Sequence, residues 1–224
     1  MRSTPIALAL MALLACKGEK DPPPAGEKPA GEGETAAGPA KKKSNITKIQ
    51  MAVPYGKQVA CADVFTVENF TKYIGDAIGE IKDKSSSNKE ASMSCAFHRG
   101  GEAPKTDQQL KKYEKENMKL GVLPGDEYCM VTAYCSMSND DPEEFKETCK
   151  ARGDTGNEQL GGFACVHQTE RGVEYAYTYK IVDPETKCLL EVMGGPSVTD
   201  EALVQKCTTA ALEEMAPNKL TNFK

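Results

Sequence analysis

The sequence predicts an α+β domain in which about four helices pack on antiparallel sheet and disulfides hold the elements together. Helical and β-rich stretches follow one another in the order helix, strand, helix, strand, helix, three strands, helix. Short turns separate the last three strands, and hairpins of this kind require antiparallel pairing. The chain of 224 residues contains nine cysteines, which suits an exported protein with disulfides.

Four helices are predicted from apolar residues that recur at three and four positions and from capping residues. They cover residues 67–81, 106–120, 142–151 and 199–215. Thr66 caps the first helix, for which Gly75 offers an alternative, earlier end. Pro142 at the first position of the third helix follows acidic residues that suit a helix N-terminus. Ser197 or Thr199 caps the last helix.

Five strands are predicted from stretches rich in Val, Tyr and Thr that are bounded by turns. They cover residues 91–98, 127–137, 163–169, 173–182 and 188–193. The stretch VEYAYTYKIV is the most regular of them, and Arg171-Gly172 forms the hairpin turn before it. Residues 152–157 are expected to form a loop.

The N-terminus has the pattern of a secretory signal. Arg2 supplies a positive charge, and an unbroken apolar run of ten residues, 6–15, ends just before Cys16. Such a run is about half as long as a membrane-spanning helix requires. Export followed by removal of residues 1–15 is therefore predicted.

The segment Leu13-Leu14-Ala15-Cys16 resembles the lipobox of bacterial lipoproteins. The resemblance implies cleavage before Cys16, attachment of diacylglyceryl and palmitate to this residue, and a partner that is the membrane itself. It also implies an outer-membrane location, favoured by Lys17, with the domain in the periplasm or at the cell surface. The alternative is an ordinary secretory signal in which Cys16 is discarded or remains a spare thiol.

Three regions follow from these patterns: a signal peptide at 1–15, the lipidated cysteine with a disordered linker at 16–44, and the α+β domain at 45–224. The linker contains five Pro and five Gly but lacks Val, Ile, Leu, Phe, Tyr and Met, so it cannot form a core. It would span roughly 30 Å as a flexible coil. A division of the domain into two small halves near residue 155 is the alternative to a single unit.

Charge argues against nucleic acid as a partner. Residues 45–224 contain 21 Lys and Arg against 28 Asp and Glu, a net charge of −7, whereas nucleic-acid binders carry basic patches. An envelope protein, a glycan or a small ligand is the expected partner.

Apart from Cys16, eight cysteines remain, and an even number in an exported domain predicts up to four disulfides. They are Cys61, Cys95, Cys129, Cys135, Cys149, Cys165, Cys188 and Cys207. Cys129 and Cys135 lie on one predicted strand, roughly 20 Å apart, which is too far for a bond between them. Joining each strand to a neighbouring helix gives the expected pairs Cys61–Cys95, Cys135–Cys149 and Cys188–Cys207, with Cys129–Cys165 left over. Residues 60–97 are similar to small exported lipoproteins that have a Cys before an early helix and another on the next strand.

Catalytic and metal-binding motifs are weak. The sequence contains no C-x-x-C spacing, which would indicate a zinc site, and no G-x-S-x-G motif, which would indicate a serine nucleophile. His98 and His167 are expected at partly exposed strand positions. We therefore expect no metal, no cofactor and no enzymatic activity.

Tyr175, Tyr177 and Tyr179 share one face of a predicted strand and are candidates either for a binding surface or for packing under a helix. The predicted function is a non-enzymatic binding or structural role in the cell envelope. An exported hydrolase, or an inhibitor of one, is the alternative. A cleft that holds His98 or His167 beside an acidic residue would favour the enzyme.

Overall fold

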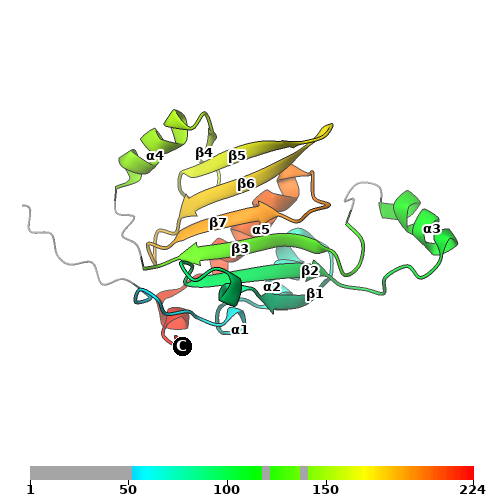
Figure 1. The fold of residues 1–224 in the computed structure, drawn as a ribbon, viewed down its shortest axis with the longest axis horizontal. Helices are drawn as coiled ribbons and strands as arrows, with labels where there is room; N and C mark the ends of the chain where they lie inside the picture. The colour runs from blue at the N-terminus through cyan, green and yellow to red at the C-terminus, as the bar shows by residue number, and fades with distance from the viewer. Residues whose placement is uncertain (1–51, 118–121, 137–140) are drawn as a thin grey trace, which may run out of the picture. The chain divides into compact units, whose positions relative to one another are not determined.

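Seven strands form one antiparallel sheet in the computed structural model, which describes residues 52–117, 122–136 and 141–224 (Figure 1). The helices are α1 (Cys61–Val64), α2 (Val67–Ile74), α3 (Asp107–Asn117), α4 (Pro142–Ala151), α5 (Glu201–Glu214) and the 3-10 turns η1 (Ser85–Ser87) and η2 (Pro217–Leu220). The strands are β1 (Ile78–Asp83), β2 (Met93–Arg99), β3 (Glu127–Tyr134), β4 (Thr155–Asn157), β5 (Ala164–Arg171), β6 (Glu174–Val182) and β7 (Leu189–Gly194). The predicted α+β class with antiparallel sheet and disulfides is confirmed.

The strand order β1-β2-β3-β7-β6-β5-β4 joins two meanders. Strands β1 to β3 form the first and β4 to β7 the second, and the antiparallel pair β3–β7 unites them at the centre. The sheet therefore continues across residue 155, and all described residues belong to one compact unit.

Helices α2 and α5 pack against each other on one face of the sheet, and α5 also packs on β3, β6 and β7. In Figure 1 they lie behind the strands. One row of residues in register crosses this face, and all of its members are buried. The row comprises Cys95, Val131, Val192, Tyr179 and Val166. It forms the floor of the hydrophobic core beneath α5.

The predicted helix over residues 67–81 is wrong in its second half. Thr66 caps α2 as expected, but Gly75 adopts φ +79° and ends the helix, after which the chain enters β1. The register of β1 shifts between Ile78 and Glu80, which indicates a β-bulge. A bulge adds one residue, so Ile78 and Ile81 both turn toward the core although three positions separate them. This spacing imitates that of a helix.

Other boundaries differ less. Residues 155–157 of the expected loop form β4, because they pair with β5 at the edge of the sheet. The last helix is capped by Asp200, whose side chain accepts a hydrogen bond from the Ala202 N–H, and not by Ser197 or Thr199. Helix α4 begins at Pro142 as predicted. Predictions for residues 1–51, including Cys16, and for 118–121 and 137–140 lie outside the described residues.

All eight domain cysteines form disulfides, and Cys61–Cys95 is confirmed. The other three expected pairs, Cys135–Cys149, Cys188–Cys207 and Cys129–Cys165, are wrong. The observed pairs are Cys129–Cys207, Cys135–Cys188 and Cys149–Cys165. Cys135–Cys149 and Cys188–Cys207 were expected because each joins a strand to the helix that follows it, and Cys129–Cys165 was the pair left over. In the structure β3 and β7 are neighbours in the folded sheet, where Tyr134 pairs with Leu189 and places Cys135 beside Cys188.

Candidate functional site

The sheet face opposite α5 carries partly exposed polar side chains. Residues alternate along a strand, so Thr178 and Lys180 of β6 lie on the face opposite to the buried Tyr179. In the same way Glu191 and Met193 of β7 lie opposite to the buried Val192. These four partly exposed positions are therefore available to a ligand.

A pocket of about 470 Å³ lies on this face, a volume typical of small-molecule sites. Its wall comes from the segment after α4 and its floor from β5, β6 and β7. The lining residues are Arg152, Asp154, His167, Thr178, Lys180, Glu191 and Met193. Strand pairing places His167 opposite Thr178 and Thr178 opposite Met193, so these three form a continuous row.

A carboxylate fixes the orientation of the pocket histidine. His167 Nδ1 lies 2.6 Å from Asp154 Oδ1, and the Asp154 side chain is only 6% exposed whereas that of His167 is 54% exposed. Asp154 Oδ2 also contacts Sγ of Cys165 at 3.4 Å, and Cys165 is bonded to Cys149. The carboxylate therefore lies against the disulfide, and Nε2 is the ring nitrogen left for a ligand.

The remaining charged groups are largely balanced. Lys180 Nζ forms an ion pair with Glu191 Oε2 at 2.7 Å, and both side chains are half-buried. Arg152, at the C-terminal end of α4, adds an exposed cationic group to the rim. Thr178 contributes a hydroxyl. The pocket therefore offers a polar ligand positively charged, negatively charged and neutral hydrogen-bonding groups.

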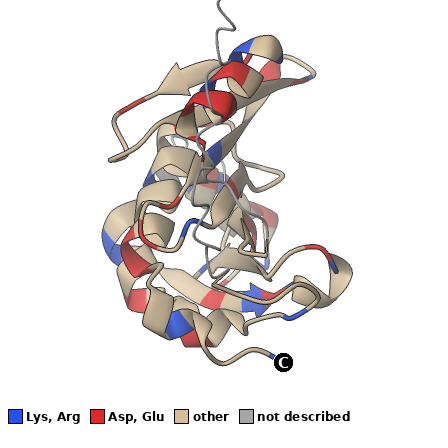
Figure 2. Ribbon diagram, turned by 90° about the vertical axis from the view of Figure 1, so that its left-hand side faces the viewer, with Lys and Arg blue, Asp and Glu red and all other residues tan. Residues whose placement is uncertain are grey.

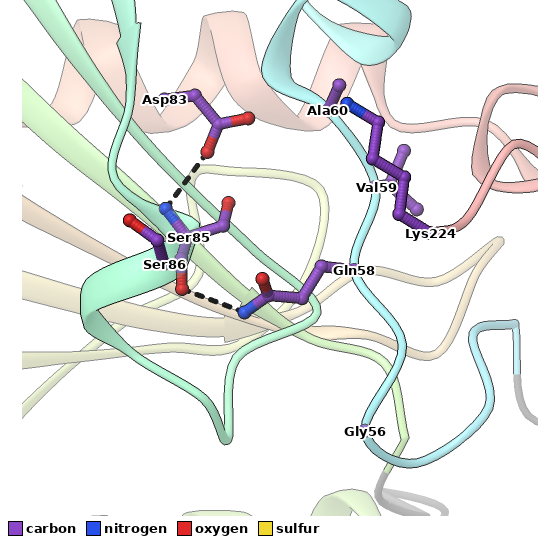
Figure 3. Close-up of a pocket in the computed structure, with 8 residues that line it drawn as sticks. All are labelled: Gly56, Gln58, Val59, Ala60, Asp83, Ser85, Ser86 and Lys224. Carbon is purple, nitrogen blue, oxygen red and sulfur yellow. Dashed lines mark hydrogen bonds between the residues drawn. The ribbon is translucent and has the colours of Figure 1, made fainter.

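A second pocket, of about 350 Å³, lies between the segment before α1 and the chain end (Figure 3). Its polar groups already bind the protein itself: Gln58 Nε2 donates to the carbonyls of Ser85, Asn88 and Ala91. Asp83 accepts a hydrogen bond from the Ser85 N–H at 2.9 Å. These groups stabilise the local fold, so this pocket is a weaker candidate than the first.

The pKa of Asp83 reflects that stabilising role. Burial by itself raises the pKa of the carboxyl, but hydrogen bonds from Ser85 and from the backbone of Cys61 oppose burial. The nearby charge of Lys224 acts in the same direction as these hydrogen bonds. Together they hold the pKa of Asp83 below its usual value.

A buried ionic cluster lies at the other end of β2. Arg99 Nη2 lies 2.6 Å from Asp76 Oδ2, and the hydroxyl of Tyr128 donates to the same carboxylate. Arg99 also stacks on the ring of Tyr113 in α3, with its guanidinium carbon 4.9 Å from the ring centroid. Burial, followed by the hydrogen bond to Asp76, raises the pKa of Tyr128. The cluster joins α3 and the α2–β1 turn to the sheet.

The tyrosine row divides between core and surface. Tyr179 is buried and donates a hydrogen bond to Glu201 of α5 at 2.8 Å, whereas Tyr175 is 44% exposed near the β5–β6 turn. Tyr177 is partly buried and packs against the core. The pocket lies on the opposite face of β6, so the row does not line it.

Sequence reasoning missed most of the pocket. It weighed His167 but not Lys180, Glu191 or Met193, although strand alternation assigns these residues to the face away from the apolar positions. Asp154 carried no signal, because its segment was expected to be a loop. His98, the other histidine, donates a hydrogen bond from Nδ1 to the Gly125 carbonyl at 2.9 Å and lies outside the pocket.

Three comparisons with known proteins give no further guide: no family model, no curated protein and no solved structure matches this chain. Every helix in the described part of the chain is too short or too polar to cross a bilayer. Figure 2 shows acidic and basic residues interspersed along the described helices and strands.

Proposed function

We propose that the protein is a bacterial outer-membrane lipoprotein, anchored through lipid on Cys16, whose domain binds a small polar ligand in the pocket beside His167. The domain lies in the periplasm or at the cell surface, and residues 17–44 act as its tether. The pairing of all eight domain cysteines supports an oxidising compartment, since disulfides persist there. The binding role is non-enzymatic.

The observation that carries the binding role is the arrangement of the pocket itself. The Asp154–His167 hydrogen bond and the Lys180–Glu191 ion pair hold these side chains in place at the pocket. Groups that are fixed before binding lose little conformational entropy when a ligand arrives. A rigid sheet with such groups is therefore suited to ligand recognition.

Membrane anchoring is tested by fractionation. A Cys16→Ser variant should leave the membrane fraction and lack the mass of the acyl chains, whereas the parent protein remains in that fraction. A parent protein that is unacylated and recovered with reduced thiols would contradict the proposal.

Ligand binding is tested by a thermal-shift screen with metal salts, small carboxylates, phosphate and cell-wall sugars. A ligand at one hundred times its Kd stabilises by about 2.7 kcal/mol, which raises Tm by roughly 5–10 °C in a domain of this size. Lys180→Met should remove or reduce the shift. Lys111→Met on α3 serves as the matched control and should leave it unchanged. A panel that produces no shift, or shifts that are insensitive to Lys180→Met, would count against the pocket.

The Asp154–His167 pair also favours a second candidate, an exported hydrolase, because a carboxylate that orients a histidine is typical of a general base. Thr178, directly opposite His167, is the hydroxyl on the pocket floor. Hydrolysis of nitrophenyl esters or phosphates that disappears in both His167→Gln and Thr178→Val would support this alternative.

A further inference from the structure

One edge of the sheet is open beside the pocket. Strand β4 pairs with β5 only as far as Val166, whereas β5 continues to Arg171 with β6 as its partner on one side. The five residues of β5 after Val166 are all exposed. In Figure 1, α4 and β4 lie above the start of β5, and no other element lies above its end. An unpaired strand edge is a template to which another chain can add.

We propose that this edge and the pocket together bind the C-terminus of an extended peptide. The peptide adds to β5 as an antiparallel strand and places its terminal carboxylate beside Arg152. In strand addition of this kind, main-chain hydrogen bonds supply affinity and alternate side chains supply specificity. The proposal rests on the proposed binding function, because the carboxylate occupies the pocket beside His167, and it assigns the ligand to the C-terminal tail of a partner protein.

The β5–β6 hairpin determines which backbone groups can receive the peptide. Arg171 pairs with Glu174 across a loop of two residues, and the pair that closes such a loop is hydrogen-bonded. Hydrogen-bonded and non-hydrogen-bonded pairs alternate along antiparallel strands, so Gln168 and Glu170 direct their N–H and C=O groups away from β6. Val166, two positions before Gln168, uses the same edge to pair with β4. Among the described residues, none bonds to the outward backbone groups of Gln168 and Glu170.

The segment before β4 determines where the peptide ends. Asp154 continues the register of β4 and contacts His167. Gly153 has φ +77°, and its N–H donates to the Lys150 carbonyl at 3.0 Å, so the chain turns away from the edge toward α4 at this point. The first open position on the edge is therefore opposite Gln168. A peptide that runs in the direction of β4, antiparallel to β5, reaches this position with its last residue.

Charge favours a carboxylate at this end of the added strand. Arg152 lines the pocket with Asp154 and His167, and no described residue engages its guanidinium. The other cation of the lining, Lys180, is already paired with Glu191. The Asp154 carboxylate is bonded to His167 and is only 6% exposed. A guanidinium can hold a carboxylate through two parallel hydrogen bonds, whereas a peptide added in the reverse direction would bring its ammonium group to the same cation.

The residues of β5 predict a preference for the peptide side chains. Directly opposed residues project from the same face, so the third residue from the end lies beside Glu170 and on the same face as Tyr175. Both of these side chains are exposed. A lysine or arginine is therefore favoured at that position, because opposite charges on adjacent strands attract.

The C-terminus of a second copy of this chain is already engaged. The Lys224 N–H donates to the Gln58 carbonyl at 2.8 Å, and Phe223 pairs with Val59. The last residues of the chain are therefore paired within one molecule, and the bound tail belongs to a different protein.

The test captures synthetic hexapeptides on the immobilised, detergent-extracted full chain. One library has free C-termini with Lys or Arg third from the end, and a second library is identical but amidated at the C-terminus. Mass spectrometry identifies the retained peptides, and fluorescence anisotropy measures the affinity of the most enriched one after labelling at its N-terminus. The free acids should be retained. Amidation should weaken binding about tenfold or more, because it removes the charge that Arg152 binds.

Matched controls exist for both the protein and the peptide. Arg152→Leu should weaken binding about tenfold or more, whereas Lys150→Leu, which changes an exposed cation of α4 outside the pocket, should bind as the parent does. Urea midpoints check that both variants are folded. In the peptide, N-methylation of the third residue from the end removes the donor to the Glu170 carbonyl and should weaken binding. The same change at the penultimate residue, whose N–H points away from β5, should be tolerated.

The proposal is overturned if no free-acid peptide is retained, if amidated peptides bind as tightly, or if Arg152→Leu and Lys150→Leu behave alike. Equal effects of the two N-methylations would also overturn the strand addition. Failure here is distinguishable from failure of the proposed function. If a compound of the thermal-shift panel binds and Lys180→Met abolishes its effect, the pocket function stands and only the peptide assignment falls. If neither peptides nor any compound of the panel binds, both are wrong.

Discussion

The Cys129–Cys207 disulfide joins the central strand β3 to α5, and its removal tests the nested arrangement of the bonds. The perturbation is the double variant Cys129→Ala with Cys207→Ala. The bond closes a loop with a sequence separation of 78 residues. On the chain-entropy model, an isolated loop of this size stabilises the folded state by about 4.5 kcal/mol. The Cys135–Cys188 bond lies inside this loop and already restricts the unfolded chain.

The inner bond shortens the effective loop. Six positions lead from Cys129 to Cys135 and nineteen from Cys188 to Cys207, so the path through the inner bond is only about 25 residues long. On the same model, closing a loop of that size stabilises the folded state by about 3.5 kcal/mol. We therefore expect the free energy of unfolding to fall by about 3.5 kcal/mol, and not by the larger value for the isolated loop.

Urea unfolding followed by circular dichroism measures this loss. The matched control is Cys61→Ala with Cys95→Ala, which opens a separate loop of 34 residues that corresponds to about 3.8 kcal/mol. All four cysteines are buried, so the small cavities left by alanine affect both variants alike. The reasoning is refuted if the Cys129–Cys207 variant loses less than about 1 kcal/mol, or if peptide mapping of the parent joins Cys207 to Cys188.

Three further predictions concern stability and are measured by urea unfolding. Arg99→Leu should cost about 3 kcal/mol, because it leaves the Asp76 carboxylate without its cation in a largely buried cluster; no loss would contradict that role. Thr66→Ala should cost about 1–2 kcal/mol, since it removes both the cap of α2 and a hydroxyl partner of Glu214, and an unchanged midpoint would show the cap to be dispensable. Burial raises the pKa of Asp83, but the hydrogen bonds from Ser85 and Cys61 together with the charge of Lys224 outweigh burial and hold the folded pKa below its unfolded value, so the stabilisation is complete above about pH 4 and is lost as the pH falls further. Asp83→Asn should therefore lose less stability than the parent between pH 5 and pH 2, and equal losses would be inconsistent with this linkage.

Local patterns were sufficient for the elements whose own residues determine them. Helix α4 begins at Pro142 because an acidic cap precedes a residue whose ring fixes φ for the first turn. Strand β6 follows from its regular alternation of Tyr with smaller residues. The failure at residues 75–81 has an equally local cause, since the bulge at Gly79 turns two isoleucines three positions apart to the same side of a strand.

The pocket could be predicted only in part. Alternation along β6 and β7 identifies which side chains share a face, but it does not identify which strands are neighbours. The row His167, Thr178 and Met193 on the pocket floor requires β6 to pair with both β5 and β7. Asp154 reaches His167 because β4 returns to the sheet edge beside β5.

The sequence by itself determined the class of the fold, the use of eight cysteines in disulfides and most helix and strand positions, because periodicity, capping and turn residues act over a few neighbours. The tertiary structure alone decided three of the four disulfide pairs and the contents of the pocket. Burial of the common core beneath α5 selects which distant strands meet, and that choice minimises exposed apolar surface over the whole chain rather than within any one segment.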